Sequence, residues 1–402
     1  MSHAKIVNFL LSVTVILATL LFGCAPVLKK EAKRPQDALR EVRYLYPDFI
    51  DDMDLASLKT AIKRNLEYLR KLNPDHIFYY GNRVVPPGEV IKTQERFLSI
   101  ISLKGLDSKD LKKVIRDEFI LLKATGRQGN PKVLFTGYFE PIFEANRWPN
   151  HIYQYPIYRL PADMVTVDLS LFREKCAGRR LVGRLQGQSL IPYYTRSQIV
   201  KDRVLDGRGL EIAWLKDPVD VLFLQIQGSG KLVLPDGSMI HVGYMGSNGH
   251  PYRSIGRYMV EKGYLKLEEV SMQSIRRYLR KHPHFVDEIL GHNPSYVFFR
   301  EMDSGPVGNI GVVLTPGRSI ALDSRLFPKG ALCFISCEKP VIDGAGNITN
   351  WTRFSRFVLN QDTGGAIRGA GRADIFWGSG KYAEIAAGHQ RHEGELYILI
   401  AK

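Results

Sequence analysis

Gln361-Asp362-Thr363-Gly364-Gly365 begins the stretch of sequence on which the fold depends most. The stretch continues as Ala366-Ile367-Arg368-Gly369 and, after two more residues, as Arg372-Ala373-Asp374-Ile375-Phe376-Trp377-Gly378. Paired glycines let a backbone turn sharply or approach a ligand closely. Asp362 and Asp374 are therefore candidates for acid and base chemistry at a place that a substrate can reach.

Residues 372–377 alternate as a β-strand does, which places Arg372, Asp374 and Phe376 on one face. A carboxyl group beside an aromatic ring is partly desolvated, and desolvation raises its pKa toward neutral pH. The guanidinium of Arg372 acts in the opposite direction, so the sequence leaves the net shift open. The simpler alternative makes Asp362 a turn residue and Asp374 a surface carboxylate.

From residue 132 onward, short runs rich in Val, Ile, Tyr and Phe alternate with Gly, Pro, Asn and Asp. This spacing is typical of strands in a barrel or sandwich, and it predicts a mainly β fold with helices. The runs that we predict as strands are residues 133–139, 219–227, 231–234, 311–314 and 332–336.

Apolar residues at helical spacing mark the region before these strands. One stripe consists of Leu58, Ile62, Leu66 and Leu69, and a second, behind Ser108 as N-cap, of Leu111, Ile115, Phe119 and Leu122. Helical spacing returns between residues 247 and 295, with stops at Gly263 and Pro283. Helices that interrupt a β region predict an inserted unit.

The composition favours a two-domain globular protein, since 402 residues with 45% hydrophobic content can form one large core or two smaller ones. The formal net charge of +15 favours an acidic polymer or surface as partner. Nucleic acid, anionic lipid and the carboxylate-bearing cell wall all carry such charge. We find no zinc-like Cys/His spacing, RNA-binding aromatic signature or helix-turn-helix pattern, so we expect no nucleic acid partner.

The first 24 residues predict a secretory signal. Lys5 precedes a mostly apolar run over residues 6–22, and Gly23 precedes Cys24. An ordinary membrane anchor is the alternative, but a span needs about 20 continuous apolar residues. Leu21-Phe22-Gly23-Cys24 resembles the lipobox of bacterial lipoproteins, which implies cleavage before Cys24 and its acylation.

Ala25 follows the cysteine where an Asp would resemble an inner-membrane retention signal, so we expect an outer-membrane anchor that faces the periplasm. Residues 25–40 contain several basic residues and read as a solvated tether. Cys333 and Cys337 lie roughly 13 Å apart if they share one strand, which is too far for a disulfide. A bridge from Cys176 to either remains open, as do free thiols.

The order of motifs resembles the membrane-bound lytic murein transglycosylase A family over roughly residues 130–400. The matching motifs are Phe135-Thr136-Gly137-Tyr138-Phe139-Glu140-Pro141, Tyr155-Pro156-Ile157-Tyr158-Arg159, Gln225-Ile226-Gln227-Gly228-Ser229-Gly230, Asp236-Gly237-Ser238, Asn248-Gly249-His250-Pro251-Tyr252-Arg253 and Asn293-Pro294-Ser295-Tyr296. The C-terminal part resembles the domain named for three aspartates, here Asp323, Asp362 and Asp374. The interval from Asp362 to Asp374 is about one residue longer than in the enterobacterial member.

This resemblance implies a double-psi β-barrel with a smaller inserted β-barrel domain and a groove between them for a glycan strand. The barrel domain with its N-terminal helices would comprise residues 41–140 and 302–402, and the insert residues 141–301. The implied activity is that of a peptidoglycan lytic exotransglycosylase, with Asp374 as the single catalytic acid. It would cleave the bond between N-acetylmuramic acid and N-acetylglucosamine and leave a 1,6-anhydro end.

The other motif residues would bind the glycan strand. Those that we expect to contact substrate are Asp362, Tyr138, Gln227, Gly228, Ser229, Tyr252, Arg253 and Asp323. Arg253 could hold a lactyl or peptide carboxylate. Gly228 and Gly230 lack the Lys-Ser/Thr ending of a phosphate loop, and the histidines lack metal-ligand spacing, so we expect neither cofactor nor metal.

Three other functions compete with this interpretation. Asp362-Thr363-Gly364 matches the triplet of aspartic proteases, but it occurs once and follows Asn360-Gln361 where an apolar strand is expected. A non-catalytic peptidoglycan-binding lipoprotein would bind glycan without forming a product. A muramidase would differ only in using water as acceptor. Stem-peptide preference, exo or endo action, oligomeric state and partners in a wall-synthesis complex stay open.

Overall fold

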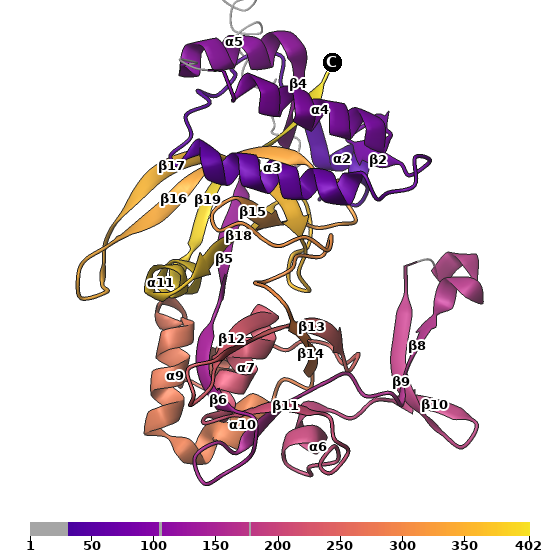
Figure 1. The fold of residues 1–402 in the computed structure, drawn as a ribbon, viewed down its shortest axis with the longest axis vertical. Helices are drawn as coiled ribbons and strands as arrows, with labels where there is room; N and C mark the ends of the chain where they lie inside the picture. The colour runs from indigo at the N-terminus through magenta and orange to yellow at the C-terminus, as the bar shows by residue number, and fades with distance from the viewer. Residues whose placement is uncertain (1–30, 104–106, 177) are drawn as a thin grey trace, which may run out of the picture.

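The computed structural model of the chain describes residues 31–103, 107–176 and 178–402. It consists of a barrel domain that carries the N-terminal helices, an inserted β domain, and a β-arm that stands apart from both (Figure 1). The predicted signal peptide and Cys24 lie outside the described residues. No helix within the described ranges has both the length and the apolar character that crossing a membrane requires.

The barrel domain is built on six strands that close on themselves, because β19 pairs with both β16 and β5. Its strands are β5 (Val133–Glu140), β15 (Ser319–Ala321), β16 (Leu332–Ile342), β17 (Ile348–Asp362), β18 (Arg372–Ser379) and β19 (Arg391–Ala401). The pairs β15–β17 and β18–β5 are parallel, and the other pairs are antiparallel. This arrangement agrees with the expected barrel and sets β18, which carries Asp374, between β15 and β5.

N-terminal helices and short strands cover one end of the barrel (Figure 1). They are α2 (Pro35–Ala38), β1 (Leu39–Glu41), α3 (Leu55–Leu69), β2 (Phe78–Tyr80), β3 (Arg83–Val85), α4 (Pro87–Ile100), α5 (Ser108–Glu118) and β4 (Phe119–Ala124). Helix α3 begins at a side-chain cap, where Asp54 accepts from the backbone N–H of Ser57 at 2.7 Å. The predicted stripe on α3 is buried against the barrel core, so the stripe is structural as expected.

Buried polar contacts fix this N-terminal region to the barrel. The fully buried guanidinium of Arg318 donates to Asp51 at 2.6 Å and to the carbonyl of Phe357 at 2.8 Å. Gln361, the residue before Asp362, donates to the carbonyl of Ala61 in α3 at 3.2 Å. A buried polar group must find partners, so these bonds specify how α3 docks beside the end of β17.

The insert contains a second six-stranded sheet in the order β14-β13-β12-β6-β11-β7. Its strands are β6 (Ile142–Asn146), β7 (Tyr155–Tyr158), β11 (Glu211–Leu215), β12 (Ser229–Val233), β13 (Met239–Ser247) and β14 (Val297–Met302). A bridge between Arg159 and Phe299 brings the end of β7 beside β14, so this sheet also curls into a barrel. The chain enters the insert directly from β5, since β6 begins two residues after Glu140.

Helices pack on the insert and at its boundary with the barrel. They are α6 (Arg196–Val200), α7 (Pro218–Gln227), α8 (Ile255–Glu261), η3 (Leu267–Glu269), α9 (Met272–Lys281), η4 (Pro283–Phe285) and α10 (Val286–Gly291). Helix α11 (Lys381–His389) belongs to the barrel domain and lies next to α9 (Figure 1). Arg276 of α9 pairs with Glu384 of α11 at 3.5 Å, which ties the two domains together.

The arm is a three-stranded antiparallel sheet with two short 3₁₀ helices at its free end (Figure 1). Its elements are β8 (Met164–Asp168), η1 (Leu169–Leu171), η2 (Glu174–Cys176), β9 (Arg180–Gln186) and β10 (Ser189–Pro192). This projection has no signal in the sequence, because its strands are short and resemble the others in composition.

The structure corrects three predictions of secondary structure. Residues 219–227 form helix α7, because Asp217 caps the backbone N–H of Val219 and Pro218 suits a first turn. Helix α5 is capped by Asp107 rather than Ser108, and Phe119 begins a strand. Residues 311–314 contain only an isolated bridge to residue 307. The run at 219–227 was predicted as a strand because a buried apolar run has no periodicity that distinguishes a helix from a strand.

Residues 35–40, the last part of the predicted tether 25–40, do not form a solvated linker. They form α2 and β1, and β1 pairs with β4. Ala38 and Leu39 are buried in the barrel-domain core, which outweighs the basic character of the segment.

The structure also shows the arrangement of the described cysteines. Cys333 and Cys337 share strand β16 and are free, as predicted from their spacing. Cys176 is free on the arm, so the bridge left open by the sequence is not formed. Burial raises the pKa of both strand thiols, which keeps them protonated and unreactive.

Candidate active site

Asp374 lies on strand β18 with its side chain 19% exposed. Its neighbours Ala373 and Ile375 are fully buried on the opposite face of the strand, so the predicted alternation is correct. The parallel register sets Asp374 opposite Thr136 of β5, and the hydroxyl of Thr136 donates to its carboxylate. The Nε of Arg372 approaches the same oxygen at 3.5 Å.

Burial raises the pKa of Asp374 from 3.8 to about 6. The positive charge of Arg372 and its hydrogen bond lower the pKa, while the negative charge of Asp362 raises it further. Desolvation therefore outweighs Arg372, which decides the question that the sequence left open. A carboxyl group with this pKa can both give and take a proton near neutral pH.

Asp362 lies at the end of β17, where the chain leaves the barrel wall for its glycine-rich turn. One carboxylate oxygen accepts from the Tyr138 hydroxyl at 2.9 Å, and the other from the backbone N–H groups of Asn309 at 3.0 Å and Thr363 at 2.9 Å. Burial raises the pKa of Asp362, although these bonds lower it. The carboxylate is held rigidly, as a positioning or binding group is.

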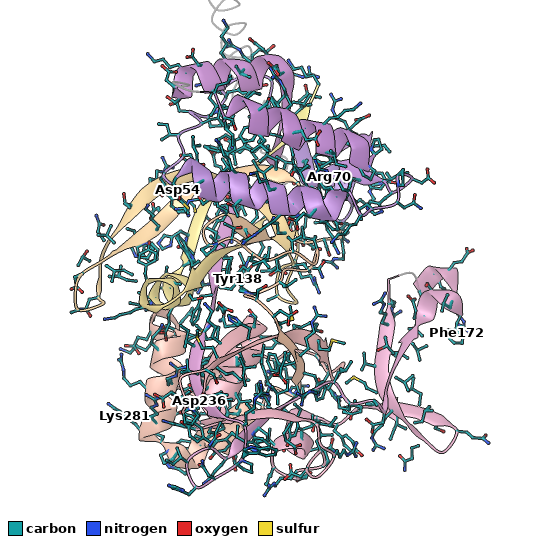
Figure 2. All side chains as sticks on the ribbon, viewed as in Figure 1. Asp54, Arg70, Tyr138, Phe172, Asp236 and Lys281 are labelled. Atoms are coloured by element: carbon teal, nitrogen blue, oxygen red, sulfur yellow. The ribbon has the colours of Figure 1, made fainter. Side chains whose placement is uncertain are left out.

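Tyr138 joins the two aspartates into one site. Its ring lies 5.2 Å from that of Phe376, which shares the face of β18 with Asp374. Burial and the charge of Asp362 raise the pKa of the Tyr138 phenol well above 10, so it stays a hydrogen-bond donor. Tyr138 comes two residues before Glu140, where the chain crosses to the insert (Figure 2).

Asp323 is fully buried and has its oxygens occupied. It accepts from the guanidinium of Arg325 at 2.6 Å and from the backbone N–H of Gly369 at 2.8 Å. Burial acts to raise its pKa, but the bonds from Arg325 and Gly369 lower the pKa overall. Asp323 thus holds the turn between Asp362 and Asp374 in place, and Gly369 supplies the positive φ of 82° that this turn needs.

Gln227, Gly228 and Ser229 lie where α7 ends and β12 begins. Gly228 ends the helix with a φ of 78°, which a side chain would strain. The carbonyl oxygen of the Gln227 side chain accepts from the backbone N–H of Phe139 at 3.0 Å. This contact places Gln227 beside β5, at the residue that directly follows Tyr138.

Tyr252 and Arg253 are exposed in the loop after β13. The backbone N–H of Arg253 donates to the side chain of Asn293 at 3.1 Å, which fixes the loop on the insert. Among the described residues, neither side chain has a hydrogen bond or ion pair with Asp374 or Asp362. The structure therefore brings Asp374, Asp362 and Tyr138 together on the barrel domain. Tyr252 and Arg253 lie on the insert.

Two residues of the site were not singled out from the sequence. Thr136 contacts the carboxylate of Asp374, and Gly137 lets Trp377 pack against β5, since a Cβ there would come within 2.7 Å of the indole. Both depend on the β5–β18 register, which joins residues far apart in the chain. Their only sequence signal is their place beside Tyr138 in the motif at 135–141.

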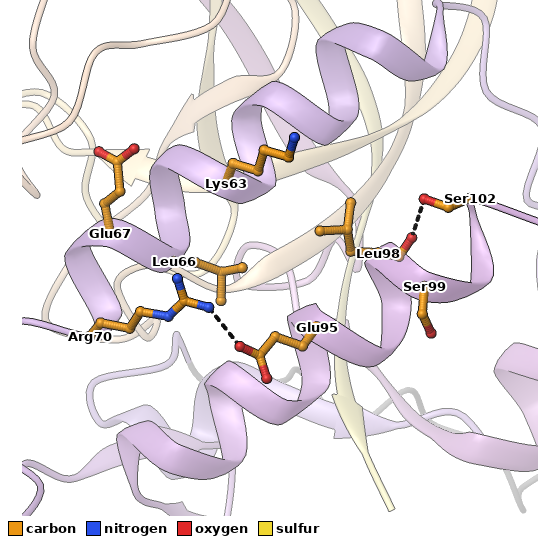
Figure 3. A pocket seen from close by; sticks show the side chains of 8 residues that line it. All are labelled: Lys63, Leu66, Glu67, Arg70, Glu95, Leu98, Ser99 and Ser102. Carbon is orange, nitrogen blue, oxygen red and sulfur yellow. Dashed lines mark hydrogen bonds and ion pairs between the residues drawn. The ribbon is translucent and has the colours of Figure 1, made fainter.

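Two cavities of the described structure lie away from Asp374. One, of about 500 Å³, is a charged groove between α3 and α4, where Arg70 and Glu95 pair at 2.7 Å (Figure 3). The other, of about 540 Å³, lies where the domains meet and includes Arg276 and Glu384. Within residues 31–103, 107–176 and 178–402, no three His, Cys, Asp or Glu side chains come together as metal ligands do.

Known protein families match the insert and the C-terminal part of the barrel domain separately. A family model described as the MltA specific insert domain matches residues 134–300, and one described as the 3D domain matches residues 318–400. Membrane-bound lytic murein transglycosylase A of Escherichia coli K12 is 32% identical over 277 residues, 68% of this chain and 67% of that protein. The chain belongs to the lytic murein transglycosylase A family.

Other members of the family agree in sequence and fold. The protein of this name from Vibrio cholerae is 32% identical over 68% of this chain and 66% of its own length. A membrane-bound lytic murein transglycosylase structure from Agrobacterium tumefaciens superposes with a TM-score of 0.74 at 31% identity, covering 90% of this chain and 98% of that one. MltA of E. coli with bound chitohexaose gives 0.65 at 26% identity, covering 92% and 96%.

Proposed function

We propose that this chain is a lytic transglycosylase that cleaves the glycan strands of peptidoglycan, with Asp374 as its acid and base. The observation that supports this most directly is the mostly buried carboxyl of Asp374, whose pKa of about 6 suits proton transfer in both directions. The names of the relatives, which are lytic murein transglycosylases, support the same reaction and substrate.

The reaction begins with protonation of the oxygen between N-acetylmuramic acid and N-acetylglucosamine by Asp374. The bond from this oxygen to C1 of the muramic acid breaks, and an oxocarbenium-like state forms. The Asp374 carboxylate then takes the proton of the 6-hydroxyl of the same sugar, whose oxygen bonds to C1. The products are a free 4-hydroxyl and a 1,6-anhydromuramoyl end, and Asp374 regains its proton.

This scheme requires no second carboxylate as nucleophile. The oxygens of Asp362 already accept bonds from Tyr138, Asn309 and Thr363, so Asp362 is suited to hold a sugar or shape the site. Its negative charge raises the pKa of Asp374 and so favours the protonated acid. Asp323 acts indirectly, because it accepts from the backbone N–H of Gly369 and so holds the turn between Asp362 and Asp374.

The insert supplies the remaining contacts to the strand in this proposal. Gln227, Gly228 and Ser229 face the glycan from the junction of α7 and β12, and Tyr252 stacks on a sugar. The exposed guanidinium of Arg253 pairs with a lactyl or peptide carboxylate. The solved family member with bound chitohexaose shows a relative holding a sugar chain, which supports a glycan site of this kind.

We also propose that acylation of Cys24 anchors the chain to the outer membrane, facing the periplasm. Support comes from the apolar run before Cys24 and from the relatives, which are named membrane-bound. Several acyl chains anchor a protein stably. Proteins of a wall-synthesis complex are further candidate partners.

Digestion of purified peptidoglycan tests the reaction. The proposed products are muropeptides lighter by one water than muramidase products, because the 6-hydroxyl replaces water as acceptor. Mass spectrometry distinguishes the alternatives: hydrated reducing ends would indicate a muramidase, and tight binding with no product would indicate a non-catalytic wall-binding protein.

A further inference from the structure

The β-arm leaves an apolar sheet face without a described partner. Antiparallel register sets Val167 opposite Leu181 and Leu190 opposite Leu185, and residues directly opposite share one face. Leu185 is 62% exposed, and Leu181 is half-exposed. A sheet of three short strands depends on an apolar face being covered for its stability, so this face calls for a partner outside the described chain.

The free end of the arm exposes further apolar residues. Leu171 is 84% exposed and Phe172 is 73% exposed, and Phe172 lies at the end that projects furthest from both domains (Figure 2). Single exposed apolar residues are common on protein surfaces. Leu171 and Phe172 are neighbours in the chain at the end of a projecting element, which is instead typical of an interaction surface.

Basic side chains lie next to the apolar residues of the free end. They are Arg173, Lys175, Arg179 and Arg180, against the acidic Asp168 and Glu174. A fifth, Arg184, lies on the opposite face of β9 from Leu185 and places its guanidinium over the Tyr194 ring at 4.3 Å. Asp168 already pairs with Arg180 at 3.7 Å, which leaves the basic excess around the tip. Apolar residues bordered by Lys and Arg are the pattern of elements that lie in the interface of an anionic bilayer.

We propose that the β-arm is a membrane-interface element that binds an anionic lipid bilayer. Leu171 and Phe172 enter the acyl boundary, and the arginines beside them contact the phosphate headgroups. A second copy of the chain fits less well, because two arms with the same charge excess repel. A glycan strand fits less well too, since its hydroxyls gain nothing from contact with exposed leucines.

Vesicle sedimentation of residues 31–402 tests this proposal without the N-terminal lipid. These residues include all described core clusters of both domains, and they omit Cys24. The wild type should bind vesicles of equal parts phosphatidylglycerol and phosphatidylcholine, and should bind pure phosphatidylcholine more weakly. Leu171→Ser combined with Phe172→Ser should weaken binding about tenfold or more, as should Arg173→Gln combined with Arg179→Gln.

Leu267→Ser is the matched control, because Leu267 is also an exposed leucine of the insert, at 57%, but lies off the arm. It should bind vesicles as the wild type does. Absence of vesicle binding by the wild type would overturn the proposal, and so would equal binding by the Leu171/Phe172 variant. A dimer in sedimentation velocity that Leu185→Ser dissociates, without vesicle binding, would identify the face as a self-association surface instead. None of these readouts depends on glycan cleavage.

Discussion

The barrel and the insert differ in how they place their polar side chains. On the barrel, Asp374 sits beside the core with a pKa raised by burial, and Asp362 is held by three hydrogen bonds. On the insert, Tyr252 and Arg253 are exposed on a loop. A mostly buried carboxyl is costly to ionise and suits proton transfer, whereas exposed side chains suit binding. The difference supports the proposed roles, in which the barrel supplies the acid and the insert supplies further contacts to the substrate.

The largest expected effect is that of Asp374→Asn. A general acid commonly contributes about 10² to 10⁴ in rate, and here one group serves both bond cleavage and ring closure, so kcat should fall by the upper figure or more. Glycan binding should persist because Asn keeps the shape. Cleavage and binding would be measured on the same peptidoglycan, with the exposed Asp75→Asn as control. Full activity in Asp374→Asn would remove Asp374 from the mechanism.

Asp362→Asn should have a smaller effect on kcat. Loss of its charge-assisted bond to Tyr138 should lower turnover by roughly 10- to 100-fold. Tyr138→Phe removes the same bond, so the double variant should be little worse than either single one. Additive losses would show that the two side chains act separately. A loss in Asp362→Asn as complete as in Asp374→Asn, with normal folding, would favour a two-carboxylate mechanism.

Arg372→Gln should shift the pH profile rather than abolish activity. Arg372 lowers the pKa of Asp374, so its removal raises that pKa. The first step needs the protonated acid, which predominates below the pKa, and the alkaline limb of kcat should therefore move to higher pH. The exposed Arg368→Gln should leave the limb in place. A shift to lower pH in Arg372→Gln would contradict the electrostatic assignment.

The smallest expected effect belongs to the insert. Arg253→Gln should raise KM by roughly three- to tenfold and leave kcat nearly unchanged, because it removes a binding contact made equally before and during reaction. Arg257→Gln on the nearby helix α8 serves as control. If Arg253→Gln lowered kcat as strongly as Asp362→Asn, the division of roles between the two domains would be wrong.

Much of the difference between the barrel and the insert could be predicted from the sequence. Strand alternation predicted that Asp374 and Phe376 share one face of a strand. The order of motifs predicted two β domains, with the acid in the barrel domain. Short-range patterns carry such information because strand alternation is local. The balance between burial and Arg372 could not be predicted, because it depends on packing across the barrel.

Other features depended on contacts that sequence does not reveal. Thr136 meets Asp374 only through the register of two strands that are over 200 residues apart in the chain. Helix α7 was mistaken for a strand because its residues are buried nearly all round, which hides the helical period. The projection of the arm also has no local signal, since it follows from how β8 to β10 leave the insert.

The most direct test of the central claim is the pKa of Asp374 itself. Carbon NMR of chains labelled at the aspartate carboxyl carbon follows each group with pH, and the signal missing from Asp374→Asn identifies Asp374. Burial of the carboxyl predicts a midpoint at about 6. A midpoint near the ordinary value of 3.8 would contradict the account, because the carboxyl would then be ionised at neutral pH and unsuited to start the reaction as an acid.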